Sequence, residues 1–180
     1  MGRILDSNYR RRIQKPANII KWSGVKEGMY ILEVGCGSGA FTTFFARATG
    51  KSGRIFALDI QKNMLVQLER KLRKSENRDI GNIEIVHSDA HNMPFKDNFF
   101  DLAYMISVFQ EIPDKVKTLS EIIRVLKTGG LLSISEFITD PDFPFRKTTI
   151  KQSCSGGFKL DGIFGKPWNY TIRFRNGGNN

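Results

Sequence analysis

Three glycines alternate directly after an apolar run in the segment ILEVGCGSGA, at Gly35, Gly37 and Gly39. Because glycine has no Cβ, such a loop can turn tightly and let a ligand lie against the backbone. The helix that follows turns its free N–H groups toward negative charge. With Ala40, the segment fits the dinucleotide fingerprint G-x-G-x-x-G/A. Counted from Glu33, it equally fits the loop of an S-adenosylmethionine (SAM) site. The segment by itself leaves two ligand groups open, a pyrophosphate and the methionine part of SAM.

Two carboxylates farther along the chain indicate a nucleoside. Asp59 ends the segment RIFALD, twenty residues after Gly39, where a carboxylate can accept hydrogen bonds from both hydroxyls of a ribose. The alternative role, a cap for the next helix, suits Asn63 better. Asp89 and Ala90 follow another apolar segment and are well placed for the edge of an adenine. Since both candidate ligands contain adenosine, the ribose residue does not choose between them.

The elements that position these residues alternate between apolar runs and helical patterns. Strands are predicted at 29–34, 54–60, 83–87, 100–106 and 131–136, and helices at 38–49, 63–74 and 114–126, with Asp114 as a cap and Gly129-Gly130 as the end of the last. A short helix at 148–155 and strands at 159–164 and 170–175 follow. This order predicts an α/β fold, a doubly wound, mostly parallel sheet with helices on both faces. Ligands of such sheets bind beyond the carboxyl ends of the strands.

Composition excludes several classes of protein. The chain has 180 residues, of which 40% are hydrophobic, enough for one domain with a core. No apolar run reaches the ~18 residues of a membrane span, and the first residues do not form a signal peptide. The two cysteines have no CxxC spacing, which argues against a disulfide framework or a zinc site. We therefore predict a cytoplasmic protein without a metal site.

The net charge of +10 is concentrated at the two ends of the chain. Residues 1–27 and residues 141–180 each hold seven Lys/Arg against two Asp/Glu, whereas residues 28–140 hold fourteen of each. This division predicts a basic N-terminal helical segment, 1–27, ahead of a nucleotide-binding domain, 28–180. The charged flanks have two interpretations, solubility or a surface for an anionic partner.

Five landmarks in register give the chain a resemblance to a known family. They are EVGCGSG at 33–39, LD at 58–59, SDA at 88–90, FD at 100–101 and RVLKTGG at 124–130. In this order they resemble class I SAM-dependent methyltransferases, and among these the ubiquinone/menaquinone-biosynthesis type, over about residues 15–175. A lone glycine motif is weak, but five landmarks in order are specific. The resemblance implies a Rossmann-like sheet of seven strands, the last antiparallel, with SAM as cofactor and S-adenosylhomocysteine as product.

The resemblance also implies roles for single residues. Glu33 would hold the amino group of the methionine part, above a loop made by Gly35, Gly37 and Gly39. Asp59 would bind the ribose hydroxyls, while Ile60, Asp89 and Ala90 would contact the adenine. Tyr104 and Met105 would lie near the sulfonium. Many relatives carry a histidine pair where this chain has Gln110-Glu111, so no role of those histidines transfers.

Methyl transfer from a sulfonium is an in-line displacement in which orientation carries most of the effect. A base is needed only if the nucleophile begins protonated. The candidates near the strand ends are Tyr104, Glu111, Glu136 and His91, and each has an equally good structural role, so no catalytic residue is assigned. The residues after the fourth strand lack the D/N-P-P-Y/F/W run of methyltransferases that act on exocyclic base amines. Neither cysteine follows a proline, so the Pro-Cys nucleophile of cytosine-C5 methyltransferases is absent as well.

Together these features predict a SAM-dependent methyltransferase with a small acceptor. The basic flanks favour an anionic acceptor, captured by Arg10, Arg11, Arg12, Arg146 and Lys147. The alternatives are an RNA methyltransferase, a non-catalytic SAM-binding subunit and, less favoured, a NAD-dependent oxidoreductase, which would leave Asp89-Ala90 and RVLKTGG unexplained.

Overall fold

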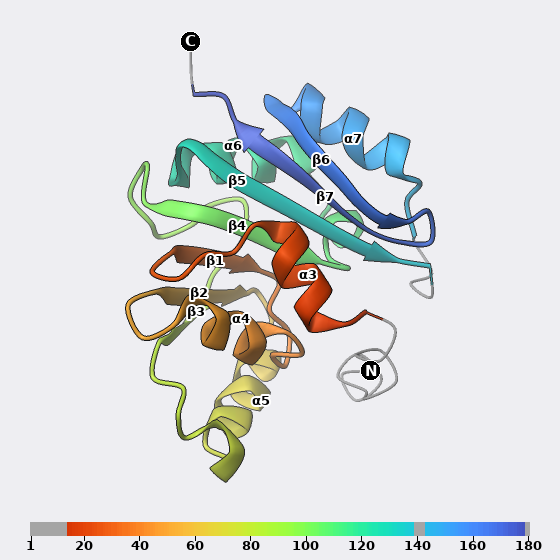
Figure 1. Cartoon of the computed structure of the whole chain (residues 1–180). Helices are drawn as coiled ribbons and strands as arrows, with labels where there is room; N and C mark the ends of the chain where they lie inside the picture. Colours follow the sequence, from red (N-terminus) through yellow and green to blue (C-terminus); the bar gives the residue numbers. More distant parts are fainter. Residues whose placement is uncertain (1–13, 139–142, 179–180) are drawn as a thin grey trace.

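Seven strands form one sheet, in the order β3-β2-β1-β4-β5-β7-β6, in the computed structural model, which describes residues 14–138 and 143–178 (Figure 1). Neighbours from β3 to β5 pair in parallel, and β7 runs antiparallel to both β5 and β6. The predicted α/β fold, with an antiparallel last strand, is confirmed. The strands are β1 (Tyr30–Val34), β2 (Arg54–Asp59), β3 (Ile83–His87), β4 (Phe100–Ile106), β5 (Leu126–Phe137), β6 (Phe158–Lys166) and β7 (Asn169–Asn176).

Helices cover both faces of this sheet. In Figure 1, α3 and α4 lie in front of the sheet, whereas α6 and α7 lie behind it. The helices are α3 (Pro16–Ser23), α4 (Thr42–Thr49), α5 (Lys62–Leu72), α6 (Lys115–Val125) and α7 (Arg146–Ser155), with short 3₁₀ turns η1 (Ser75–Asn77) and η2 (Phe109–Glu111). Among the described residues, no helix combines the length and the apolar composition that a bilayer span requires.

Several predicted boundaries are corrected by the backbone. The first predicted helix begins only at Thr42, since the glycine loop occupies the residues before it. Asn63 lies inside α5, whose N-cap is Gln61, so it is not the cap. Gly129 and Gly130 do not end α6, because that helix stops at Val125 and β5 begins at Leu126. Asp114 does cap α6, since its carboxylate accepts a hydrogen bond from the Lys117 N–H group. Of the predicted segment 1–27, residues 1–13 lie outside the described residues.

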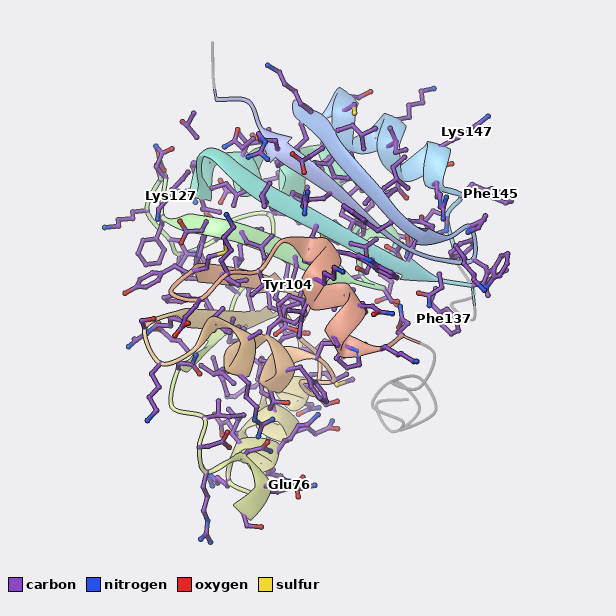
Figure 2. All side chains as sticks on the ribbon, viewed as in Figure 1. Glu76, Tyr104, Lys127, Phe137, Phe145 and Lys147 are labelled. Carbon is purple, nitrogen blue, oxygen red and sulfur yellow. The ribbon has the colours of Figure 1, made fainter. Side chains whose placement is uncertain are left out.

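Strand alternation decides which side chains meet beneath the glycine loop. Glu33 of β1 and Tyr104 of β4 are register partners, so they point to the same face of the sheet. On that face the Tyr104 ring stacks on Phe45 of α4, with ring centroids 3.8 Å apart. Figure 2 labels Tyr104 in the interior, where its side chain is 1% exposed. Glu33 is therefore held in a buried layer between the sheet and α4.

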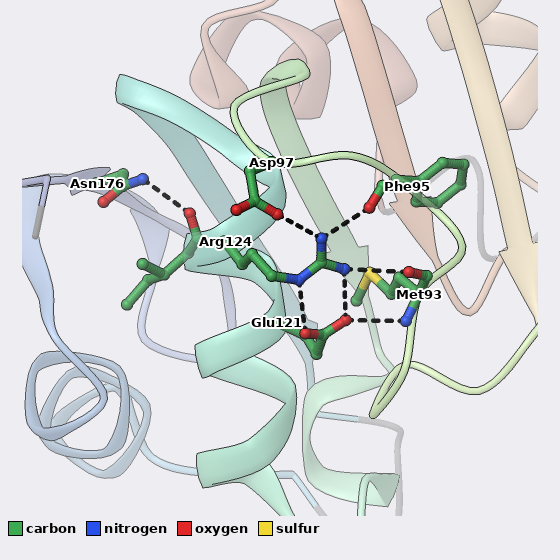
Figure 3. A network of polar contacts seen from close by, with 7 residues as sticks. Met93, Phe95, Asp97, Glu121, Arg124 and Asn176 are labelled. Carbon is green, nitrogen blue, oxygen red and sulfur yellow. Dashed lines mark hydrogen bonds and ion pairs between the residues drawn. The ribbon is translucent and has the colours of Figure 1, made fainter.

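A polar network fixes the long segment between β3 and β4 against α6 (Figure 3). The Arg124 guanidinium donates two hydrogen bonds of 2.8 Å to the Glu121 carboxylate and one to Asp97. It also donates to the carbonyl oxygens of Met93 and Phe95. The bidentate pair lowers the pKa of Glu121. Arg124, the first residue of RVLKTGG, thus holds the segment that begins with Ser88, Asp89 and Ala90.

Replacing Arg124 should destabilise the fold more than replacing an ordinary surface arginine. Arg124→Lys keeps the charge but cannot reproduce the bidentate geometry, so we expect the free energy of unfolding to fall by about 2–3 kcal/mol. Urea unfolding measures this loss. The control is Arg54→Lys, because Arg54 makes an exposed ion pair of 3.7 Å with Glu84, and such pairs contribute little. Equal losses in the two variants would contradict the role of the network.

Candidate cofactor-binding site

A cavity of about 410 Å³ opens at the carboxyl ends of β1, β2, β3 and β4. It brings together residues from four separate segments that the sequence singled out. Among them are Glu33, Gly35, Gly37, Asp59, Ile60, Asp89 and Ala90. Its far wall is apolar and consists of Ile106, Val108, Ile112 and Pro113. The loops that follow parallel strands therefore meet at one site, as expected for this class of sheet.

The glycine loop has the shape that a ligand cradle requires. Gly37 has φ +54°, and a Cβ placed on it would meet no protein atom within 4 Å, so this position faces open cavity. Gly35 has φ +73°, and its Cβ would lie 2.6 Å from a methyl carbon of Val108. The left-handed backbone favours glycine at both positions. Gly35 serves packing, and Gly37 leaves room for a ligand.

Glu33 is a buried carboxylate without a complete set of partners. The residue is 4% exposed, and its Oε2 atom has no hydrogen-bond partner among the described residues. Burial raises the pKa of Glu33 to about 8, a shift that the Thr42 and Tyr104 hydroxyls and the Lys71 charge only partly oppose. Neither hydroxyl has the geometry of a regular hydrogen bond to it. An amino group in the cavity would supply the missing partner.

Asp59 holds the glycine loop as well as facing the cavity. Its Oδ2 accepts a hydrogen bond of 2.8 Å from the Gly37 N–H group, and its Oδ1 accepts one of 2.8 Å from the Gln61 N–H group. Each oxygen keeps a second lone pair, which fits the two adjacent hydroxyls of a ribose. The backbone bond to Gly37 was not foreseen from the sequence. It means that Asp59 is joined directly to the glycine loop.

Replacing Asp59 should weaken SAM binding and also loosen the loop. In Asp59→Asn one oxygen becomes an amide donor, which faces a backbone N–H group, and the charge-assisted bonds are lost. We expect calorimetry to show an affinity loss of about 1.5–3 kcal/mol, with a lower melting temperature. The control is Asp101→Asn, because Asp101 pairs with Lys127 outside this cavity. Unchanged SAM affinity in Asp59→Asn would contradict the ribose role.

The adenine residues lie at the rim of the cavity. Asp89 is half-exposed, and its Oδ1 accepts a hydrogen bond of 2.8 Å from the His91 N–H group. That bond is the main reason why the pKa of Asp89 is lowered. Ile60 is 61% exposed and lines the same rim as Ala90. The rim offers a carboxylate and an apolar side chain, so adenine contacts by Asp89, Ala90 and Ile60 stay a prediction.

Tyr104 and Met105, which the resemblance places near the sulfonium, do not line the cavity, so that role stays a prediction. Both are buried and neither lines the cavity, because β4 continues to Ile106 and strand alternation turns Tyr104 toward α4. The end of β4 instead contributes Ile106, Ser107 and Val108. Ser107 has φ +55°, rare for a residue with a side chain, and its buried hydroxyl has no partner among the described residues. Nothing in its sequence context marked Ser107 as a site residue.

The four candidate bases separate into two pairs. Glu111 and His91 line the cavity, whereas Tyr104 and Glu136 do not. Both ring nitrogens of His91 are engaged, with the Asp114 carbonyl at 3.2 Å and with the Asp89 carboxylate at 3.0 Å. Of the four, Glu111 and His91 are thus the two that face the space where an acceptor would bind.

Gln110 and Glu111, which are neighbours in η2, have different surroundings. The Gln110 side chain donates a hydrogen bond to the Glu136 carboxylate of β5, and Glu136 is fully buried. This bond fixes η2 against the sheet, while Glu111 lies at the cavity. The two residues thus serve different purposes, one structural and one facing the ligand space.

The charge of the cavity is opposite to that of the flanks. Its acidic side chains are Glu33, Asp59, Asp89 and Glu111, and no Lys or Arg of the described residues lines it. Arg146 donates a hydrogen bond to the Gly165 carbonyl and lies over the Tyr170 ring, so it does not reach the cavity. Arg10, Arg11 and Arg12 lie outside the described residues. An acidic cavity does not favour the anionic acceptor that the flanks suggested.

Comparison with known proteins shows which family the chain belongs to. The family described as "Methyltransferase domain" matches residues 32–134. The chain is 35% identical over 143 residues to demethylmenaquinone methyltransferase of Staphylococcus saprophyticus, covering 79% of the chain and 56% of that protein. It is 36% identical over 128 residues to the ubiquinone/menaquinone biosynthesis C-methyltransferase of Psychromonas ingrahamii, covering 69% and 49%. The chain thus spans about half the length of these curated relatives.

A solved structure confirms the fold. The crystal structure of a SAM-dependent methyltransferase from Aquifex aeolicus superposes with a TM-score of 0.85 at 23% identity. The superposition covers 95% of this chain and 94% of that chain. At this identity the likeness establishes the architecture alone, including the seven-stranded sheet.

Proposed function

The chain belongs to the class I SAM-dependent methyltransferases, and from this premise we propose that it transfers the methyl group of SAM to a small aromatic acceptor related to demethylmenaquinone. One observation carries the choice of cofactor. The cavity beside the glycine loop is lined by Glu33, a buried carboxylate whose Oε2 has no hydrogen-bond partner within residues 14–138 and 143–178. A cationic amino group completes that site, and the methionine part of SAM has one.

The same observation argues against a dinucleotide. A pyrophosphate on the glycine loop would offer the buried Glu33 no cationic partner and would be repelled by the Asp59 carboxylate, and such repulsion is strong in a buried site. No Lys or Arg among the described lining residues would compensate for that repulsion. A NAD-dependent oxidoreductase is therefore disfavoured on electrostatic grounds.

When bound, SAM supplies an electrophilic methyl group on a sulfonium. The protein's own residues hold the two reactants in line. Glu33, the loop at Gly37 and Asp59 orient the cofactor, and the apolar wall formed by Ile106, Val108, Ile112 and Pro113 excludes water. This wall suits an uncharged ring better than a phosphate.

Methylation of a ring carbon also requires that protons leave the acceptor. The names of the relatives imply transfer to carbon, and a reduced quinone ring attacks more readily once a hydroxyl proton is removed. Glu111 lines the cavity from η2, and the Gln110–Glu136 hydrogen bond holds η2 in place. We assign the acceptance of this proton to Glu111.

The test is methyl transfer to a defined acceptor. The chain is incubated with methyl-labelled SAM and a reduced demethylmenaquinone analogue with a short side chain, and products are identified by mass spectrometry. We expect a singly methylated ring, and no product with Gly37→Val. Labelling of RNA instead would contradict the acceptor. SAM binding without transfer to the analogue, to RNA or to cell extract would favour a non-catalytic SAM-binding subunit.

A further inference from the structure

Three large apolar side chains are exposed at the same end of the molecule. Ile138 is 55% exposed, Phe145 77% and Trp168 48%. They follow the carboxyl end of β5, precede α7 and occupy the turn between β6 and β7, respectively. Exposed lysines, Lys147 and Lys166, lie beside them in sequence. We call these five residues the end patch.

Hydrogen bonds bring the three segments of the end patch together. The Ile138 N–H group donates a hydrogen bond of 2.9 Å to the Trp168 carbonyl. The Arg146 guanidinium donates one of 2.7 Å to the Gly165 carbonyl, which joins the start of α7 to the hairpin turn. In Figure 2, Phe145 and Lys147 project outward at the right edge, beside that turn. Hydrogen bonds thus hold the three segments that carry the patch at the same end of the sheet.

The exposed charges beside the end patch have one sign in two of its three segments, and the third, which ends at Ile138, contains the fully buried Glu136 as its only acidic residue. Residues 143–151 and 162–170 contain Arg146, Lys147, Lys151 and Lys166 but no Asp or Glu. The Lys166 ammonium lies 5.4 Å from the centroid of the Trp168 ring, so a cation and an aromatic ring lie side by side on this surface. The neighbouring Asp140 and Asp142 lie outside the described residues.

We propose that the end patch docks on the surface of an anionic lipid bilayer. Trp and Phe side chains favour the boundary between headgroups and acyl chains, and Lys and Arg beside them are attracted to anionic headgroups. Isolated exposed apolar residues are ordinary, but here three are grouped and surrounded by cations. This arrangement matches a surface that is anionic outside and apolar beneath.

The position of the end patch links the bilayer to the cavity. The arrows of β4 and β5 point toward the β6–β7 turn in Figure 1, and the cavity lies beyond the carboxyl end of β4. A lipid-soluble acceptor would then pass from the bilayer to the cavity at the same end of the sheet. This last step rests on the proposed function, whereas the docking itself does not.

Single-stranded RNA is the competing anionic partner, and the patch suits it less. RNA binders without sequence preference place successive aromatic faces along a basic groove. Here the Trp168 ring already has the Lys166 ammonium near it, and the aliphatic Ile138 offers no stacking surface. RNA binding is therefore kept as an outcome of the test.

The experiment is co-sedimentation of the full chain with vesicles of defined composition. Phosphatidylcholine vesicles are compared with vesicles in which about a third of the lipid is phosphatidylglycerol, since surface anionic lipids attract basic segments. We expect binding only to the anionic vesicles, and weaker binding at higher salt. Lys147→Gln combined with Lys166→Gln should reduce the partition coefficient about fivefold for each lysine. Phe145→Ser combined with Trp168→Ser should reduce it at least about tenfold.

Matched controls come from the opposite end of β6. Leu160 is 46% exposed, a fraction similar to the 48% of Trp168. Lys159 is its exposed basic neighbour. The variants Leu160→Ser and Lys159→Gln should bind the vesicles like the wild-type chain. In the Phe145/Trp168 variant, SAM affinity and the melting temperature should also stay unchanged, because neither residue lines the cavity.

Each outcome decides for or against docking. Absent binding to anionic vesicles, equal losses in patch and control variants, or binding to RNA without binding to vesicles would each overturn the proposal. Methyl transfer to a short-chain, water-soluble acceptor without vesicle binding would overturn the docking alone. Vesicle binding by the end patch without methyl transfer would support the docking and remove the proposed function.

Discussion

Gly37→Val is expected to abolish SAM binding while the chain remains folded. The new side chain would enter cavity space that holds no protein atom within 4 Å of the Cβ position, so it collides with a ligand on the loop rather than with the protein. We expect affinity to fall at least about a hundredfold, which corresponds to about 2.7 kcal/mol. Calorimetric titration with SAM measures the loss.

The control for Gly37→Val must carry the same backbone strain. Gly129→Val provides it, because Gly129 has φ +77° and also has no neighbour within 4 Å of its Cβ position. Either valine costs about 1–3 kcal/mol of stability in the left-handed region. Of Gly37 and Gly129, only Gly37 lines the candidate site, so the Gly129→Val control should bind SAM normally. Normal binding by a folded Gly37→Val protein would mean that the loop does not cradle SAM.

Glu33→Gln is expected to weaken SAM binding about 30- to 150-fold at pH 8. The variant keeps the shape of the side chain but loses the charge that pairs with the ligand ammonium, and hydrogen bonds between charged groups contribute about 2–3 kcal/mol. The measurement is calorimetry at pH 8. A loss below about threefold would show that the amino group binds elsewhere.

The pH dependence of affinity provides an independent test of Glu33. Its pKa is raised to about 8 by burial, so below pH 8 the carboxyl group is protonated in the free protein and must lose its proton before it pairs with an ammonium. Affinity for SAM should therefore fall about tenfold per pH unit between pH 8 and pH 6. The Glu33→Gln profile should be flat over this range. Parallel profiles for the two proteins would contradict the pairing.

The same shift has a defined effect on stability. The folded protein binds the Glu33 proton up to about pH 8, whereas the unfolded chain releases it near the ordinary glutamate pKa of 4.5. Because the folded state then holds more protons, this group lowers the free energy of unfolding as pH rises from about 4.5 to 8. Urea unfolding should show Glu33→Gln gaining stability relative to wild type across that window. If Glu33→Gln binds SAM more weakly and yet is more stable than the wild-type protein, misfolding does not explain its loss of affinity.

The sequence predicted the fold well because its signals were local and periodic. Strand 83–87 and strand 100–106 have the predicted bounds, since apolar runs between turns define them sharply. The predicted limit of α6 at Gly129-Gly130 was wrong, because β5 begins at Leu126 and extends past the glycines. Pairing with β4 extends β5 toward its start, and such tertiary pairing leaves no mark in a local pattern.

The candidate site was predictable where motif spacing determines position. The topology brings four predicted residues to one cavity because each lies at or near the carboxyl end of a parallel strand. They are Glu33, Gly37, Asp59 and Asp89. Tyr104 does not line the cavity, because it lies two residues before the end of β4.

Other features of the site depend on contacts between distant segments. The left-handed Ser107, the raised pKa of Glu33 and the bond between Asp59 and the Gly37 N–H group are of this kind. They arise from burial and from the geometry of the loop, and residue types alone do not reveal them.

The most direct test of the central claim is calorimetric titration with SAM at pH 7, in two buffers with different ionisation enthalpies. We expect one SAM to bind per chain and about one proton to be released on binding, because Glu33 must ionise before it pairs with the ammonium group of SAM. Glu33→Gln should release none. Binding of NAD without any heat from SAM, or SAM binding that releases no proton, would contradict the account.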